Sequence, residues 1–277
     1  MTDESGAYDA VRRDGVLEVR HPGAEWLSTG VDGGRIRADR AYNLSVPEGW
    51  GHTDLRAYVD ERLERAGFDV VATDTSRERP PALLTGVDIA DARGARCGPV
   101  TAYATAGVSN PAALPIAPAG GSLPDDSDEP SDGDFDRGND DGFDESDNDS
   151  DGPPPGTGTV NVVVGTTRAL ADGALANLIA VAAEAKAATL LETTGFPGTT
   201  TDAIVAGHDP SGRPARFSGS GTVVGAAARA CVREAVRASL AAHYDDHEIG
   251  CPASVEEATY GVSTDVRATV FEPPTLE

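Results

Sequence analysis

The sequence predicts an α+β fold, a single domain in which a mainly antiparallel sheet packs with helices. Short alternating or β-branched segments, separated by turns of hairpin length, fill much of the first hundred residues. Two proline-free stretches rich in Ala, Leu and Val, residues 170–191 and 223–243, are long enough for helices. Strands gathered at one end with helices interleaved later are typical of this class.

The first half of the predicted domain, which we place at residues 15–244, consists mostly of strands. Residues 1–14 are polar and are expected to form a flexible N-terminus. Thr53 is a suitable N-cap for a helix that ends near residue 66, with Leu55, Val59 and Leu63 on its inner face. The predicted strands are residues 16–19, 25–30 and 40–46, forming an antiparallel meander, and then residues 69–72, 82–87 and 100–105.

The segment from Gly158 to Asp202 is the centre of the predicted domain. Residues 159–164 are β-branched and bounded by glycines, which predicts a buried strand. The helix that follows, residues 170–191, is apolar on nearly every side but too polar for a membrane span, so it belongs inside the domain. Because isolated charges are costly to bury, Glu184 and Lys186 are the first candidates for function. They lie about 200° apart around the helix and must find separate partners.

The last part of the chain predicts a strand pair and a second helix. Residues 203–206 form a short apolar strand, residues 208–212 a hairpin turn and residues 215–217 the return strand. The helix at 223–243 carries three arginines at four-residue spacing, which predicts a solvated face. Residues 245–277 are expected to form an irregular tail.

Charge is the strongest compositional signal. The 277 residues include 46 Asp and Glu against 22 Lys and Arg, a net charge of −24, which is not the balance of a nucleic-acid binder. Such an excess of carboxylates suits a high-salt cytosol, where screening weakens self-repulsion. Lys186 is the single lysine. In a chain that otherwise uses arginine, this compact ammonium indicates a functional role or a buried ion pair.

Residues 119–155 predict a disordered acidic insertion. Between Asp125 and Asp151 there are 14 Asp and Glu against one base, Arg137, with almost no apolar residues to bury. A calcium loop is the alternative, because residues 147–152 match the pattern D-x-D-x-D-G. Gly158 stands where such a loop requires a bidentate glutamate, and three prolines fall inside it, so calcium is disfavoured.

No metal site, disulfide or targeting segment is predicted. Cys97, Cys231 and Cys251 are far apart and have no C-x-x-C spacing. His243, His247 and Cys251 are four apart, which is compatible with a metal on one helix face, but a glycine and a proline flanking Cys251 disfavour that helix. The opening residues have no basic or apolar signal region, and no segment reaches transmembrane length, so a cytoplasmic protein is expected.

Two polar groupings are candidates for binding. The turn Gly219-Ser220-Gly221-Thr222 precedes a helix, so its N–H groups suit a phosphate or an oxyanion, and simple capping is equally compatible. Its spacing is one residue too long for a dinucleotide fingerprint. No serine fits the pattern G-x-S-x-G, although Ser109 and Asn110 at a strand end can line a site. Asn177 shares a helix face with Glu184, so the two can meet at one pocket wall or each make a buried hydrogen bond.

Several stretches, taken in order, resemble one known family. They are Trp26-Leu27-Ser28-Thr29-Gly30 with Gly33-Gly34, Thr105-Ala106-Gly107-Val108-Ser109-Asn110, Gly158-Thr159-Val160-Asn161, Glu184-Ala185-Lys186, Thr201-Asp202-Ala203-Ile204, and Gly219-Ser220-Gly221-Thr222 with Gly225. Over residues 16–243, apart from the acidic insertion, they resemble the adenosylcobinamide amidohydrolase family of archaeal and bacterial corrinoid salvage. The resemblance implies hydrolysis of the amide that joins aminopropanol to the propionyl arm of the corrin ring, giving adenosylcobyric acid.

That reaction assigns expected roles to the candidate residues. An unactivated amide requires a nucleophile, donors for the oxyanion and an acid for the departing amine. Glu184 is expected to activate water, and Lys186 or Asp202 to deliver a proton or orient the substrate. The substrate-binding residues implied are Ser109, Asn110, Asn161 and Thr201 for the corrinoid amides, and Gly219, Ser220, Gly221 and Thr222 for the oxyanion. The scheme includes no metal, nucleic acid or membrane, and it specifies neither a cofactor nor an oligomeric state.

A second interpretation stays open. The same glycine turns suit a non-catalytic module that binds a corrinoid or a nucleotide. Release of a free amine from adenosylcobinamide distinguishes the two.

Overall fold

The computed structural model describes residues 7–47, 54–68, 79–123, 158–245, 250–258 and 260–275. The strands are β1 (Asp9–Arg13), β2 (Val16–Arg20), β3 (Glu25–Ser28), β4 (Gly34–Arg37), β5 (Arg40–Ser45), β6 (Ala82–Thr85), β7 (Arg93–Cys97), β8 (Val100–Ala106), β9 (Ala112–Ala113), β10 (Val160–Leu170), β11 (Ala203–Ala215) and β12 (Val262–Ser263). The helices are α1 (Leu55–Arg65), α2 (Asp172–Thr194) and α3 (Val223–Asp245), with the short 3-10 turn η1 (Ile89–Asp91).

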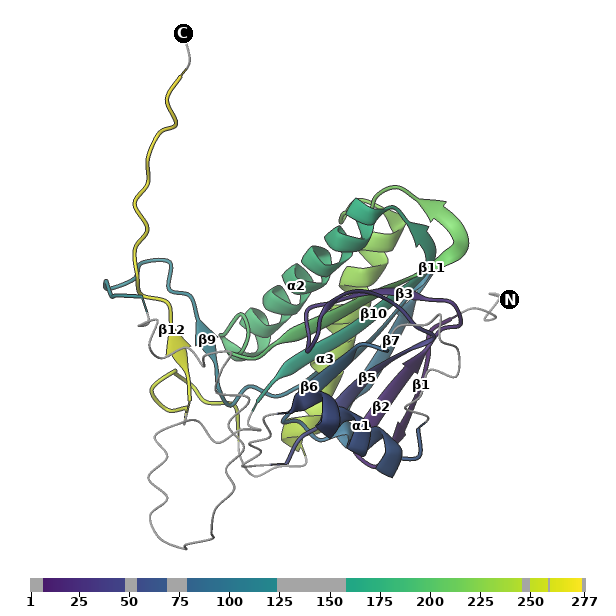
Figure 1. The fold of residues 1–277 in the computed structure, drawn as a ribbon. Coiled ribbons are helices and arrows are strands. Elements are labelled where there is room, and N and C mark those ends of the chain that lie inside the picture. The colour runs from purple at the N-terminus through teal and green to yellow at the C-terminus, as the bar shows by residue number, and fades with distance from the viewer. Residues whose placement is uncertain are drawn as a thin grey trace, which may run out of the picture.

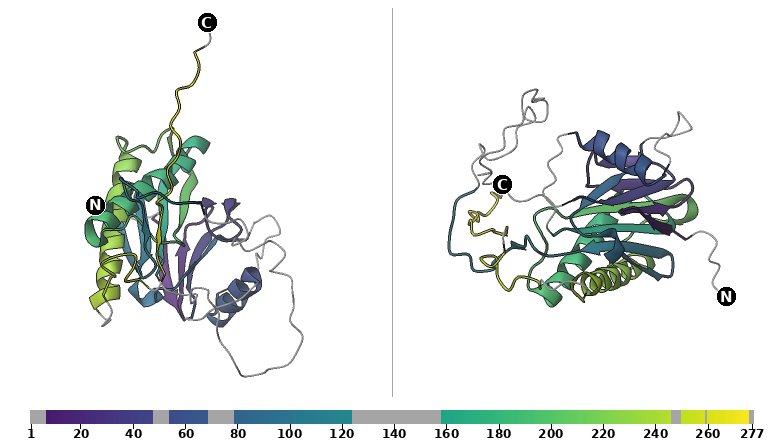
Figure 2. Two further views of the ribbon diagram at one scale, coloured as in Figure 1. Left: turned by 90° about the vertical axis from the view of Figure 1, so that its left-hand side faces the viewer. Right: turned by 90° about the horizontal axis from the view of Figure 1, so that it is seen from below.

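Ten of the described strands build two packed sheets, and β9 and β12 form a separate two-stranded sheet. The large sheet has the order β4-β3-β11-β10-β8-β7, and the small sheet has the order β1-β2-β5-β6. Helices α2 and α3 cover one face of the large sheet, the small sheet covers its other face, and α1 lies outside the small sheet (Figures 1 and 2). Most strand pairs are antiparallel, whereas β10 with β11 and β5 with β6 are parallel. The predicted α+β class is confirmed.

The central strand β10 shows why both faces of the large sheet are apolar. Side chains of successive strand residues point to opposite faces. Val162 and Val164 pack toward α2 and α3, while Val163 packs toward the small sheet. The same alternation in β11 places Ile204 on the helical side and Val205 on the sheet side. A strand that is buried on both faces has a continuous apolar sequence. The buried strand predicted at residues 159–164 has this pattern.

Helix α2 is the crossover connection between the parallel strands β10 and β11. It begins two residues later than predicted, at Asp172, and ends at Thr194 with Gly195 at a φ of 83°. Among the described helices, α2 is the one whose length and composition would suit a membrane span, but half of that window is buried inside the fold.

Residues 9–13 were predicted to be flexible, and that prediction is wrong. They form β1, which pairs antiparallel with β2. Asp14 and Gly15 make the connecting turn with φ values of 45° and 70°, the left-handed pair that a tight hairpin requires. Tyr8, just before β1, is 1% exposed and packs edge-on against Trp26. The Asp-Gly dipeptide is the signal that sequence reasoning overlooked.

The predicted N-terminal meander is also wrong. Strands β2 and β5 pair with each other in the small sheet, whereas β3 pairs with β4 and β11 in the large sheet. The chain crosses between the sheets at a turn closed by a hydrogen bond from Ala24 N to His21 O (3.2 Å). Strand β4 was not predicted, because Gly34, Arg35 and Arg37 are largely exposed and give no apolar alternation.

The hairpin predicted at residues 208–212 does not form. Strand β11 runs unbroken from Ala203 to Ala215, and its pairing with β10 shifts register between Thr166 and Arg168. Asp209 accepts hydrogen bonds from the backbone N and the hydroxyl of Ser211 (2.8 and 2.7 Å). The turn chemistry is therefore present, but it makes an irregularity within one strand.

Several other predicted boundaries change. Helix α1 is capped by Asp54, which accepts from Ala57 N at 2.9 Å, while Thr53 and the predicted strand 69–72 lie outside the described residues. Most of the acidic insertion, from residue 124 to 157, also lies outside them. Its first residues, 119–123, are described, and there Ala119 N donates to Asp265 Oδ1 (3.4 Å).

The C-terminal tail is not wholly irregular. Strand β12 pairs in parallel with β9, which joins the tail to the segment after β8. Thr264 and Arg267 still bond the carbonyls of Ala113 and Pro118. The chain that follows runs to residue 275 as an extended arm (Figure 1), with Val270 and Phe271 exposed.

Candidate active site

Most of the stretches that carry the family resemblance meet at one edge of the large sheet. At this edge β3 ends (Ser28), β8 ends (Ala106), and β10 and β11 begin (Val160 and Ala203). Register places Val160 opposite Ala106 and Val205 opposite Ser28, which fixes these ends beside one another. We call this region the motif edge.

Lys186 and Asp202 form an ion pair at the motif edge. Lys186 Nζ contacts Asp202 Oδ2, and the two side chains are only 10% and 11% exposed. Lys186 projects from the second half of α2, while Asp202 immediately precedes β11. Of the functional role or buried ion pair that the sequence predicted for the single lysine, the structure shows the ion pair.

Donors surround both oxygens of Asp202. Oδ1 accepts from Val160 N (2.8 Å) and from the hydroxyl of Thr199 (2.5 Å). Oδ2 accepts from Thr199 N (3.1 Å) as well as from Lys186. A Cβ on Gly198 would lie 2.6 Å from Asp202 Oδ2, so glycine is needed there for close approach. A carboxylate held by four donors is suited to fixing Lys186 and the start of β10.

The loop of residues 107–111 leads from β8 past this pair. Asn110 bonds Thr200 twice, through Nδ2 to the Thr200 hydroxyl (2.6 Å) and through its carbonyl to Thr200 N (3.3 Å). Its Oδ1 is buried and has no hydrogen-bond partner among the described residues. Ser109 lies beside Gly158, whose φ is 65°. These two predicted binding residues therefore do reach the motif edge.

Gly158→Ala is expected to displace this loop. A Cβ there would lie 2.4 Å from Ser109 N and 2.6 Å from Asn110 Oδ1, and the left-handed φ adds strain. We expect a loss of about 2–4 kcal/mol in the free energy of unfolding and, because small misplacements are costly in catalysis, a fall of about 10²-fold in turnover. Gly98→Ala is the matched control, since Gly98 has a φ of 51° with nothing within 4 Å of the added Cβ. Equal effects of the two variants would contradict a steric role for Gly158.

Thr201 and Asn161 reach the same edge in different environments. Thr201 is exposed, and its hydroxyl lies 3.0 Å from that of Thr159. Asn161 is 1% exposed, and its amide bonds Asn43 Oδ1 (3.1 Å), the Leu84 carbonyl (2.8 Å) and Ala203 N (3.1 Å). The expectation that Asn161 binds substrate is therefore not supported, because the side chain joins the large sheet to the small one.

Glu184 does not join Lys186 and Asp202. Its side chain is 62% exposed and pairs with Arg229 of α3 at 3.0 Å. Asn177, on the same face, donates instead to Ser218 Oγ (3.0 Å). The helix is buried on one side only, because α3 leaves this stripe open to solvent. The general-base role expected for Glu184 is therefore not supported.

The turn at residues 219–222 lies at the opposite end of α2. Ser218 Oγ donates to the Ala174 carbonyl at 2.6 Å, twelve residues before Lys186, or roughly 18 Å along the helix axis. Thr222 caps α3, accepting from Gly225 N at 3.0 Å. A pocket of about 500 Å³ includes this turn, Asn177 and Phe217. The predicted oxyanion donors are thus separated from Lys186 and Asp202, and capping accounts for Thr222.

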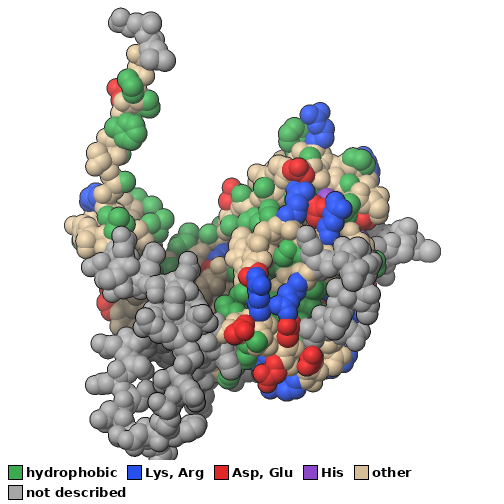
Figure 3. Space-filling model, viewed as in Figure 1, with side chains coloured by type: hydrophobic (Ala, Val, Ile, Leu, Met, Phe, Trp, Pro, Cys, Tyr) green, Lys and Arg blue, Asp and Glu red, His purple; other side chains and the backbone are tan. Residues whose placement is uncertain are grey.

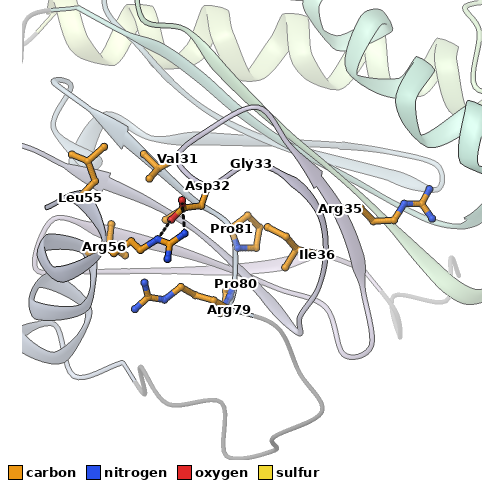
Figure 4. A pocket seen from close by; sticks show the side chains of 12 residues that line it. Val31, Asp32, Gly33, Arg35, Ile36, Leu55, Arg56, Arg79, Pro80 and Pro81 are labelled. Carbon is orange, nitrogen blue, oxygen red and sulfur yellow. Dashed lines mark hydrogen bonds and ion pairs between the residues drawn. The ribbon is translucent and has the colours of Figure 1, made fainter. Parts of the chain in front are cut away.

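A second pocket, of about 330 Å³, adjoins the motif edge (Figure 4). It lies between the β3–β4 turn, the start of α1 and the chain before β6, and its apolar wall includes Val31, Ile36 and Pro81. Arg56 reaches across it to Asp32 with hydrogen bonds of 2.5 and 2.7 Å, which hold the pKa of Asp32 below its ordinary value. Figure 3 shows other basic and acidic side chains lying next to one another on this face of the molecule.

A histidine–carboxylate pair at the motif edge was missed by sequence reasoning. His243 Nδ1 lies 2.9 Å from Asp91 Oδ2. Within the described residues no three His, Cys, Asp or Glu side chains come together as a metal site, and His247 lies outside those residues. Cys251, the third member of the spaced triplet, contacts the Val108 carbonyl through Sγ (3.9 Å).

Comparison with known proteins is consistent with this arrangement of motifs. Residues 1–248 match the family model described as adenosylcobinamide amidohydrolase. The chain is 53% identical over 266 residues to an adenosylcobinamide amidohydrolase of Halobacterium salinarum, covering 96% of this chain and 100% of the relative. It is 24% identical over 226 residues to a protein of the same name from Methanosarcina mazei, covering 78% of this chain and 90% of that relative. The chain belongs to the adenosylcobinamide amidohydrolase family.

Proposed function

We propose that this protein hydrolyses the aminopropanol amide of adenosylcobinamide, giving adenosylcobyric acid and aminopropanol for cobinamide salvage. The observation that carries the proposal is the 53% identity to a relative of that name along nearly the whole chain. The convergence of most of the family stretches on one edge, around a buried Lys–Asp pair, supports it.

The site that we assign to this reaction is the motif edge. Lys186 lies at the start of β10 and β11 through its ion pair with Asp202, and we assign it to stabilise the charge that develops on the amide oxygen. Asp202 holds the ammonium in place through the contacts described above. Ser109, Asn110 and Thr201 are assigned to bind amide groups of the corrinoid. The pocket of Figure 4 offers an apolar wall and arginines to a peripheral part of this large substrate.

The proposed setting is a salt-rich cytoplasm. The net charge of −24 supports it, as does a relative from Halobacterium salinarum. The same charge opposes nucleic acid as a partner.

The direct test is incubation of the purified protein with adenosylcobinamide in concentrated KCl. Mass spectrometry should detect adenosylcobyric acid and aminopropanol in equal amounts. Tight binding of the corrinoid without release of amine would overturn the hydrolase proposal and leave the non-catalytic binding module.

A further inference from the structure

Two of the three cysteines lie on the same side of the large sheet. Strand β7 is the outermost strand at one end of that sheet, and its last residue, Cys97, pairs with Val100 of β8. Side chains that stand directly opposite each other in an antiparallel pair share one face. Val100 packs in the apolar cluster between the large sheet and its covering helices, and Cys231 of α3 packs in the same cluster. Cys97 therefore projects from the helical face of the sheet, on the side of α3.

The Cys231 sulfur lies over this strand pair. Its Sγ donates a hydrogen bond to the Val100 carbonyl oxygen at 3.5 Å, and Val100 is the residue opposite Cys97. Burial first, and the Cys97 thiol second, raise the pKa of Cys231 to about 11, although a hydrogen bond with the Cys97 backbone acts in the opposite direction. The two thiols are therefore neighbours in the fold, although Val100 and Cys231 are 131 positions apart in the sequence.

The two thiols differ in their access to solvent. Cys97 is exposed, whereas Cys231 is 1% exposed. An oxidant from solvent reaches Cys97 first, and Cys231 is placed behind it as the resolving thiol. Cys251 stands apart from this arrangement, because its Sγ contacts the Val108 carbonyl (3.9 Å), beyond the other end of β8.

We propose that Cys97 and Cys231 form a site of reversible oxidation, at which a hydroperoxide converts the two thiols to a disulfide that fastens the edge strand β7 to α3. With hydrogen peroxide, the Cys97 sulfur forms an S–O bond as the O–O bond breaks, and one water leaves with the Cys97 proton. The Cys231 sulfur then bonds the Cys97 sulfur, the S–O bond breaks, and the leaving hydroxide takes the Cys231 proton as a second water. Two thiols are oxidised and one peroxide is reduced, and an external dithiol reverses the change.

The crosslink suits the local geometry. A disulfide requires Cα atoms no more than about 7 Å apart. Directly opposite residues of an antiparallel pair have Cα atoms about 4.5–5.5 Å apart, and the Cys231 sulfur lies against one member of the Cys97–Val100 pair. Rotation about the Cα–Cβ bond of the exposed Cys97 therefore brings its sulfur to Cys231 while the buried side chain keeps its place.

The oxidation site is separate from the site assigned to amide hydrolysis. Val100 begins β8 and pairs with Thr166, whereas Ala106 ends β8 at the motif edge. This inference is therefore independent of the proposed function. The consequence expected of the crosslink is greater stability, because closing a long loop restricts the unfolded chain more than the folded one.

The test is treatment of the folded wild-type protein with hydrogen peroxide in concentrated KCl. The remaining free thiols are then alkylated in denaturant, and the protein is cleaved after arginine without reduction, which releases the three cysteines in three different peptides. Mass spectrometry should find the peptides of Cys97 and Cys231 joined and that of Cys251 alkylated. The melting temperature should rise by roughly 5–15 °C on oxidation, and dithiothreitol should reverse the rise.

Cys97→Ser and Cys251→Ser are the matched variants. Because Cys97 is exposed, its replacement should leave the fold intact, and this variant should show neither the joined peptides nor the rise in melting temperature. Cys251→Ser should show both.

Four outcomes would overturn the inference. They are a disulfide between Cys97 and Cys251, a covalent dimer through Cys97, oxidation that stops at Cys97 as sulfenic or sulfinic acid, and joined peptides that form only after unfolding in urea. The last would mean that the fold does not bring the two thiols together. None of these outcomes bears on amide hydrolysis, which amine release tests by itself.

Discussion

Lys186→Met and Asp202→Asn are each expected to abolish amide hydrolysis and to lower the free energy of unfolding by about 3–5 kcal/mol. Each change leaves a buried charge without its partner, since the two side chains are only 10% and 11% exposed. Asp202→Asn also weakens the bonds that hold Val160 and Thr199 at the motif edge. Urea unfolding in concentrated KCl and amine release by mass spectrometry measure the two effects.

The double variant separates stability from catalysis. With both charges removed, no buried charge lacks a partner, so Lys186→Met/Asp202→Asn should recover about 1–3 kcal/mol relative to the sum of the single variants. It should recover no turnover, because the ammonium is gone. Restored turnover in a restabilised double variant would contradict a catalytic role for Lys186.

Glu184→Gln is the control on the same helix. Glu184 and Arg229 are 62% and 42% exposed, and an exposed ion pair contributes at most about 1 kcal/mol. We expect wild-type turnover and a change in unfolding free energy below that limit. A large loss of turnover would instead support the expectation from the sequence that Glu184 activates water.

The sequence was informative where a residue's environment depends on its own element. The apolar run at 159–164 and the Ala-rich run after it identified β10 and α2 without tertiary information. A lone lysine on a largely apolar helix predicted a functional role or a buried ion pair for Lys186, and Asp202 was a second catalytic candidate. The structure pairs the two.

Sequence reasoning failed where the environment depends on a distant element. Glu184 was expected to be buried, but the position of α3 decides which stripe of α2 meets solvent. Asn161 is committed to Asn43, 118 positions earlier and in the other sheet. His243 and Asp91 are 152 positions apart, so no local spacing could pair them. The hairpin at Asp14 and Gly15 is a different case. Its signal, the Asp-Gly dipeptide, is local, but the sequence analysis did not use it.

Lowering the salt is expected to unfold this protein at temperatures at which it is stable in molar KCl. The net charge of −24 repels itself, and the Debye length grows from about 3 Å at 1 M to about 30 Å at 0.01 M salt. The native state is the compact one and therefore suffers more from that repulsion than the unfolded chain. Melting temperatures followed by circular dichroism across a KCl series measure the effect. An unchanged melting temperature would contradict it.

Replacing residues 124–155 with a Gly/Ser linker should weaken this salt dependence. The segment carries 14 Asp and Glu against one Arg, so the variant keeps a net charge of −11. Its composition predicts no contribution to a core, and residues 119–123 are kept because Ala119 and Gly121 lie against Asp265. We expect wild-type turnover in molar KCl and a folded protein at lower KCl than the wild type requires. Loss of the fold in molar KCl would show that the segment is structural, whereas an unchanged KCl requirement would place the repulsion within the folded body.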